Sequence, residues 1–95
     1  TIKINEMIQF LYQAKLAAMT QKTQVDVLFS EQNIVYRWNQ SKETLQLDDN
    51  DSFESHQLSF NENGNIQGAK TLIYYCGSQR YEFVYQIGSG TFYVR

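Results

Sequence analysis

The chain has 95 residues, of which 19% are charged and 15% aromatic, and its formal net charge is −2. This length and composition predict one folded domain covering residues 1–95 and exclude an intrinsically disordered chain. The weak acidic charge argues against strong non-specific binding to nucleic acid or anionic membranes, which depends on clustered lysine and arginine. No apolar stretch reaches the roughly 18 to 20 residues that span a bilayer, so this length of chain is predicted to be soluble.

Residues 4–19 predict an amphipathic helix, because apolar residues recur at spacings of three and four. The stripe consists of Ile4, Met7, Ile8, Leu11, Ala14, Ala18 and Met19. Phe10 and Tyr12 border it, and the alanines allow close approach to a sheet. Because no capping box precedes this pattern, we expect the native helix to continue upstream of Thr1.

From residue 25 the apolar period changes from 3.6 to 2, which predicts strands. We expect them at residues 25–29, 34–38, 44–47, 58–60, 69–76, 81–87 and 91–95. The first two form a hairpin, the Asn63-Gly64 turn is predicted to form another, and the last three form a meander. Residues 48–52 predict a polar, mobile loop outside the core. The fold class is α+β, with one N-terminal amphipathic helix packed on antiparallel sheet of about seven strands.

Three segments have some features of chemical sites and are interpreted as structural. His56 has acidic and hydroxyl neighbours, but without a nucleophile-elbow motif it is predicted to be a loop histidine with no catalytic role. Residues 48–52 have the alternate spacing of a calcium loop, but Phe53 replaces its glycine and the distal glutamate is missing, so a plain acidic loop is favoured. Residues 88–90 are predicted to be a hairpin turn rather than a phosphate loop.

Cys76 is the only cysteine, which excludes an intrachain disulfide, and its apolar neighbours predict a small buried hydrophobic side chain. The alternating aromatic residues 81, 83 and 85 suit either a platform for stacking bases or ordinary sheet packing. Packing is favoured, because few basic residues accompany them. The candidate DNA contacts are Lys70, Arg80 and Arg95. We predict no catalytic residue, no cofactor and no metal.

Three segments carry a family resemblance. Residues 11–19, rich in small and apolar side chains, lead into the strand at 25–29. Residues 58–66 join a phenylalanine, a polar turn and a glycine ahead of a strand, and residues 85–90 begin a closing hairpin. Over essentially its whole length the chain resembles the type IV pilin-like minor pseudopilins, specifically the GspH/FimT-like and competence ComGD-like group.

The resemblance implies the extracytoplasmic head of a subunit that a missing upstream half-helix anchors in the cytoplasmic membrane before assembly. It implies a structural subunit, not an enzyme, of a competence pseudopilus that imports DNA, with other minor and major pseudopilins as partners at the cell surface. A subunit of a type II secretion system or a type IV pilus, a DNA-binding tip module and, last, a small hydrolase are the alternatives. Some FimT-like relatives bind DNA through arginine-rich C-terminal segments, which residues 91–95 lack.

The same resemblance implies that the start of the helix packs among sister helices. The candidate subunit-interface residues are Ile2, Ile4, Ile8, Phe10 and Leu11. Of these, Ile2 and Phe10 are expected to be exposed and to face partner subunits, with coverage of the sheet edge as the alternative.

Overall fold

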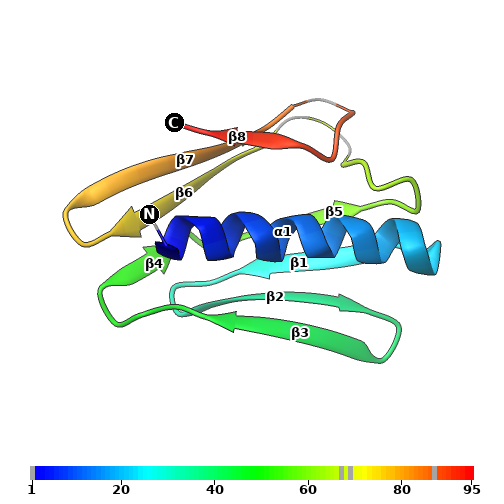
Figure 1. Ribbon diagram of the computed structural model, residues 1–95, viewed down its shortest axis with the longest axis horizontal. Helices are drawn as coiled ribbons and strands as arrows, with labels where there is room; N and C mark the ends of the chain where they lie inside the picture. Colours follow the sequence, from blue (N-terminus) through cyan, green and yellow to red (C-terminus); the bar gives the residue numbers. More distant parts are fainter. Residues whose placement is uncertain (1, 67, 69, 87) are drawn as a thin grey trace.

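The computed structural model describes residues 2–66, 68, 70–86 and 88–95, with side chains described from Ile4 onward (Figure 1). One helix, α1 (Ile2–Gln21), precedes all the strands in the sequence. The strands are β1 (Val25–Phe29), β2 (Asn33–Trp38), β3 (Ser41–Gln46), β4 (Asp51–Phe53), β5 (His56–Phe60), β6 (Lys70–Cys76), β7 (Gln79–Tyr85) and β8 (Phe92–Val94).

The strands form two antiparallel sheets, with the orders β3-β2-β1-β5 and β4-β6-β7-β8. This arrangement confirms the predicted α+β class, the first hairpin and the final meander. Figure 1 shows α1 lying lengthwise across the sheets, with β6, β7 and β8 on one side of it and β1, β2 and β3 on the other. The inner faces of both sheets therefore share one core beneath α1.

A single bent segment, residues 51–60, supplies strands to both sheets. Its first part, β4, pairs with β6, and its second part, β5, pairs with β1. Between them the Glu54 amide donates to the Ile73 carbonyl at 3.1 Å, so the segment changes sheet at residues 54–55. Such a bend is a known way for strands to turn a corner between sheets. The bent segment explains why the sequence pattern predicts about seven strands and the structure contains eight in the part described.

The prediction of a polar loop at residues 48–52 is wrong for residues 51 and 52. Asp51 and Ser52 belong to β4, and the Asp51 side chain is 3% exposed. Pairing of Asp51 with Cys76 continues the sheet, and Phe53 is inserted into the core between aromatic rings. The large burial of Phe53 draws its polar neighbours into the sheet, against their own preference for turns.

The Asn63-Gly64 turn forms, but the hairpin predicted around it does not. Gly64 has φ +79°, and the Asn61 carboxamide oxygen accepts from the amides of Asn63 and Asn65 at 2.9 and 3.1 Å. The strands on either side of this turn have other partners, because β5 pairs with β1 while β6 pairs with β4 and β7. Burial of the Leu58 and Phe60 side chains therefore decides the pairing, not the local turn.

The core face of α1 differs from the predicted stripe. Met7, Leu11, Ala14 and Ala18 are fully buried as expected, whereas Ile8 and Met19 are exposed.

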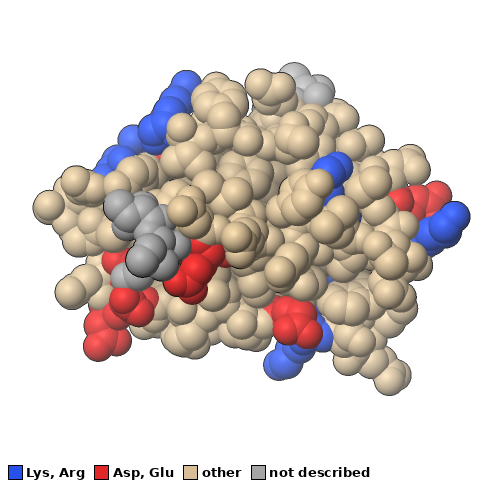
Figure 2. All heavy atoms as spheres, in the orientation of Figure 1, with Lys and Arg blue, Asp and Glu red and all other residues tan. Residues whose placement is uncertain are grey.

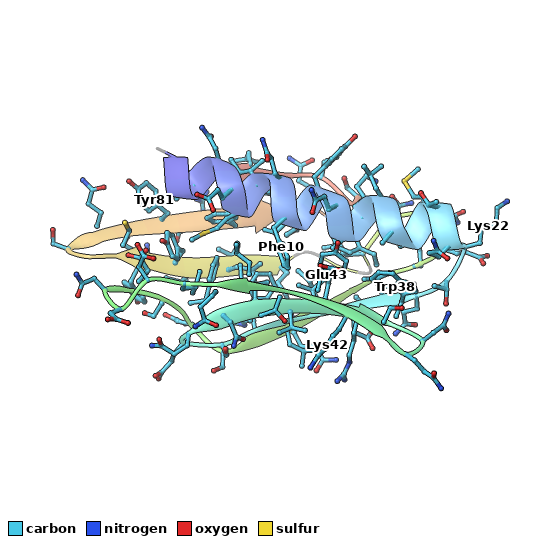
Figure 3. All side chains as sticks on the ribbon, turned by 60° about the horizontal axis from the view of Figure 1, so that its bottom comes forward. Phe10, Lys22, Trp38, Lys42, Glu43 and Tyr81 are labelled. Carbon is cyan, nitrogen blue, oxygen red and sulfur yellow. The ribbon has the colours of Figure 1, made fainter. Side chains whose placement is uncertain are left out.

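Phe10, predicted to be exposed, is 9% exposed and belongs to the core. Its ring lies 4.9 Å from that of Tyr36, which stacks on Trp38 at 5.7 Å, and Figure 3 shows Phe10 pointing from α1 toward the sheets. The expectation that Phe10 faces a partner is therefore wrong, because its ring completes the contact between α1 and β2.

No helix within the described residues is long and apolar enough to cross a membrane.

Candidate interaction surface

α1 carries a second apolar face, which stays exposed. Ile8, Tyr12, Leu16 and Met19 are 36, 53, 40 and 43% exposed. Their spacing of four, four and three residues places them on one side of the helix, next to the buried face. We call these four residues the α1 stripe. Single exposed apolar residues are normal, but a continuous row of four large ones is typical of a surface that another molecule covers.

A groove runs between α1 and the end of the second sheet. Its volume is about 500 Å³, and it is lined by Ile8, Gln9, Tyr12 and residues 90–94. We call it the β8 groove. Tyr93, 46% exposed, contributes to its rim, while Phe92 and Val94 are half-buried against the core. The groove and the α1 stripe share Ile8 and Tyr12, so they form one continuous apolar surface.

Two turns hold the groove in place beneath the second half of α1. The Ile66 amide donates to the Ser89 carbonyl at 3.0 Å, and the Lys15 ammonium donates to the Gly64 carbonyl at 2.9 Å. Gly90 is buried against Gly64, and a Cβ at Gly90 would lie 2.9 Å from the Gly64 carbonyl carbon. Only glycine therefore allows the β7–β8 connection to approach so closely.

The predicted interface residues have different environments. Ile8 lies in the α1 stripe, and Ile4 is half-buried against the core. Phe10 and Leu11 are buried within the chain and are not available to a partner. The side chain of Ile2 lies outside the described part.

Tyr12, Leu16 and Met19 were not among the interface candidates. The sequence signal that could have found Tyr12 and Leu16 is their spacing of four from Ile8, which marks a second apolar face.

The candidate DNA contacts do not form one patch. Arg80 and Arg95 both contact the Glu82 carboxylate, at 3.1 and 2.5 Å, and the hydrogen bond from Arg95 is the main cause that lowers the pKa of Glu82. Lys70 lies at the other end of the sheet, since Arg80 pairs with Tyr75, five residues or roughly 17 Å along β6 from it. The Lys70 ammonium donates to the Gln57 carbonyl. Direct DNA contact stays a prediction.

Most aromatic residues of the second sheet pack inward, whereas Tyr75 and Tyr93 are exposed. Phe83 and Tyr85 are buried, as is Tyr74, whose ring stacks on the half-buried Tyr81 at 6.2 Å. Burial raises the pKa of Tyr85, and burial together with the nearby Asp51 carboxylate raises that of Tyr74. The packing interpretation is thus confirmed for Tyr74, Phe83 and Tyr85, because buried rings cannot stack on bases.

His56 and Cys76 take different positions from those predicted. His56 begins β5 instead of lying in a loop, is half-buried, and its Nε2 lies 3.9 Å from a Glu54 carboxylate oxygen. Cys76 is a free, half-buried thiol packed against the core. Among the residues that the structure describes, no group of three or more histidine, cysteine, aspartate and glutamate side chains could hold a metal ion.

The described surface therefore offers apolar contact along α1 and a groove beside β8. Such a surface suits contact with another macromolecule, because large apolar side chains stabilise association when water leaves them. Comparison with known protein families, curated proteins and solved structures finds no match.

Proposed function

We propose that this chain is the head of a minor pseudopilin, an assembly subunit of a pilus-like machine that imports DNA. The observation that carries the proposal is the two-faced α1: one face packs on the sheets, and the α1 stripe offers a second face to neighbouring subunits. The order of elements, one long helix followed only by strands, supports the same resemblance. In this proposal the head lies outside the cytoplasmic membrane and catalyses no reaction.

The size of the α1 stripe favours repeated, weak contacts. Fully burying a large apolar side chain contributes about 1.5 to 3 kcal/mol. The four stripe residues retain 36 to 53% of their exposure, so covering them contributes roughly 4 kcal/mol in all. Association itself costs an estimated 4 to 15 kcal/mol or more. The stripe alone therefore cannot hold two free molecules together, whereas anchored subunits that touch several neighbours gain from multivalency.

Photo-crosslinking in the native host tests this role. A photoreactive amino acid at Leu16, in the full-length protein, should crosslink to other proteins that carry a pilin-type N-terminal helix, identified by mass spectrometry. The same group at Gln13, which is exposed on the polar side of α1, is the matched control and should give little of this product. Equal crosslinking from both positions, or none from Leu16, would contradict the proposal.

The coding sequence upstream of Thr1 gives an independent test. We expect it to encode a short basic leader, a cleavage site and roughly 20 apolar residues. An ordinary secretory signal in that place would overturn the proposal.

Deletion of the gene then identifies the machine. Loss of DNA uptake is expected, while loss of protein secretion or of surface pili with normal uptake would point to the related machines instead.

A further inference from the structure

The last strand of the second sheet has an open edge. β8 pairs with β7 on one side and is the terminal strand in the sheet order. Glu82 and Arg95 exchange both backbone hydrogen bonds, at 2.8 and 2.9 Å. Since such pairs alternate in antiparallel sheet, Tyr93 also bonds to β7, and the N–H and C=O groups of Phe92 and Val94 point away from it. Two residues therefore present a complete set of strand-pairing groups at the open edge.

These backbone groups face an apolar groove. The β8 groove lies between the open edge and α1, whose Ile8 and Tyr12 side chains form the opposite wall. Soluble proteins usually protect an edge strand by keeping it very short, or with lysine, proline or a bulge. β8 is short, with three residues from Phe92 to Val94, but it contains no lysine or proline. Backbone pairing groups beside a pocket for apolar side chains are the chemistry by which an extended peptide adds to a sheet.

The charges around the groove select the kind of peptide. None of the residues that line it is charged. At one end the Lys15 ammonium lies beside Gly90, and at the other β8 leads to Arg95. Arg95 shares the Glu82 carboxylate with Arg80, so these three side chains together carry one positive charge. Figure 2 shows this face with Lys and Arg atoms toward the upper left and right of centre, and uncharged atoms between them.

We propose that the β8 groove binds an extended apolar segment of a partner protein, flanked by acidic residues, which adds as a strand to the open edge of β8. Main-chain hydrogen bonds to Phe92 and Val94 give affinity, apolar contacts with Ile8 and Tyr12 select the side chains, and the cationic ends favour acidic flanks. The inference goes beyond the proposed function and does not depend on it, since it concerns an edge strand and not helix packing.

Amide hydrogen exchange with a defined peptide is the direct test. The probe is the blocked peptide Asp-Val-Thr-Val-Thr-Val-Asp, and its matched control carries lysine in place of both aspartates. Saturating probe should slow exchange at the amides of Phe92 and Val94 at least tenfold and leave Tyr93, already bonded to β7, nearly unchanged. The lysine-flanked peptide should bind several-fold more weakly, with a difference that shrinks at high salt.

A pair of variants separates the backbone contribution from the side chain. Val94→Pro removes the outward N–H without touching a bond to β7, a position where edge strands tolerate proline. It should weaken probe binding at least tenfold, whereas Val94→Ala keeps the N–H and should weaken it less. Trp38 fluorescence checks that each variant is folded, and the exchange experiment on the unaltered chain does not depend on either variant.

Other occupants give different results, each of which overturns the proposal. Slow exchange at Phe92 and Val94 that appears without peptide as the protein concentration rises would identify a second copy of this chain. Probe binding that perturbs α1 and leaves both amides unprotected would show that the edge is not used. Binding of decanoate in the groove without binding of the probe would identify a site for a small apolar ligand.

Discussion

Replacing Gly90 with alanine should destabilise the domain more than a glycine-to-alanine change in a turn normally does. The new Cβ would lie 2.9 Å from the Gly64 carbonyl carbon and 2.7 Å from the Lys15 ammonium, whereas carbon atoms in contact prefer about 3.5 to 4.0 Å. The two turns must therefore separate. Separation breaks the Ile66 to Ser89 backbone bond and the Lys15 to Gly64 bond, which contribute about 1 kcal/mol each.

Loss of packing around Ile66, which is 4% exposed, adds to these losses, and we expect a total of about 3 kcal/mol. For a domain of this size that total lowers Tm by roughly 12 to 24 °C. The assay is thermal unfolding followed by far-UV circular dichroism, with hydrogen exchange at the Ile66 amide as a local readout.

Gly77→Ala is the matched control. Gly77 has φ +61°, and no atom lies within 4 Å of the place that an alanine Cβ would occupy, so the substitution carries only the cost of a left-handed backbone, about 1 to 2 kcal/mol. Gly90 does not have a positive φ, so Gly90→Ala carries no such backbone cost. The stability that this variant loses therefore reports the steric contact. If Gly90→Ala proved no more destabilising than Gly77→Ala, or left exchange at the Ile66 amide unchanged, the close approach of the two turns would be refuted.

Three further substitutions test the core and its titrating groups. Phe10→Ala should lower the free energy of unfolding by about 3 kcal/mol in urea titrations, because the ring is buried on the sheet. Tyr85→Phe should be neutral or slightly stabilising at pH 7, since the buried hydroxyl has no hydrogen-bond partner among the described residues. Because burial raises the pKa of Tyr85, stability should fall as pH rises above about 10, where the unfolded chain ionises, and fall less in the variant. Hydrogen bonds from Gln24 and then Ser59 lower the pKa of Asp26. The stabilisation that ionised Asp26 gives the folded state is therefore present above about pH 4 and is lost as pH falls through the folded-state pKa. Ser59→Ala should raise that pKa, which a carboxyl NMR titration measures.

The fold class could be predicted because local patterns carry it. A helical period in residues 4–19 and alternation afterwards give α1 and most strands within a few residues. β3 begins three residues earlier than predicted, because an edge strand exposed on both faces has little apolar alternation. Its start follows Asn39 at φ +50°, a left-handed conformation that asparagine tolerates better than most residues.

The pairing of strands far apart could not be predicted in the same way. β5 does not pair with β6 across the Asn63-Gly64 turn, because pairing with β1 buries the Leu58 and Phe60 side chains. Asp51 enters the sheet because of Phe53, a preference that appears only when the core is assembled. These outcomes depend on contacts between distant residues, which outweigh local turn preference.

The candidate surface could be predicted only in part, for a related reason. The apolar spacing predicts a single stripe along α1, but this stripe combines residues from two faces. Among the interface candidates, Ile8 is exposed, while Leu11 and Phe10 are buried within the chain. Separating two adjacent apolar faces requires knowing which one the sheets cover. The groove beside β8 depends on where that strand ends relative to α1 and has no sequence signal of its own.

The bent segment 51–60 has a consequence for how the domain comes apart. Phe53 and Phe60, near its two ends, are both buried in the common core, so neither sheet can separate without exposing an aromatic ring that the other sheet also holds. A half-unfolded molecule with one intact sheet is thereby disfavoured, and the domain opens as a single cooperative unit. Partly unfolded species with exposed strand edges therefore stay rare, which limits aggregation of the domain.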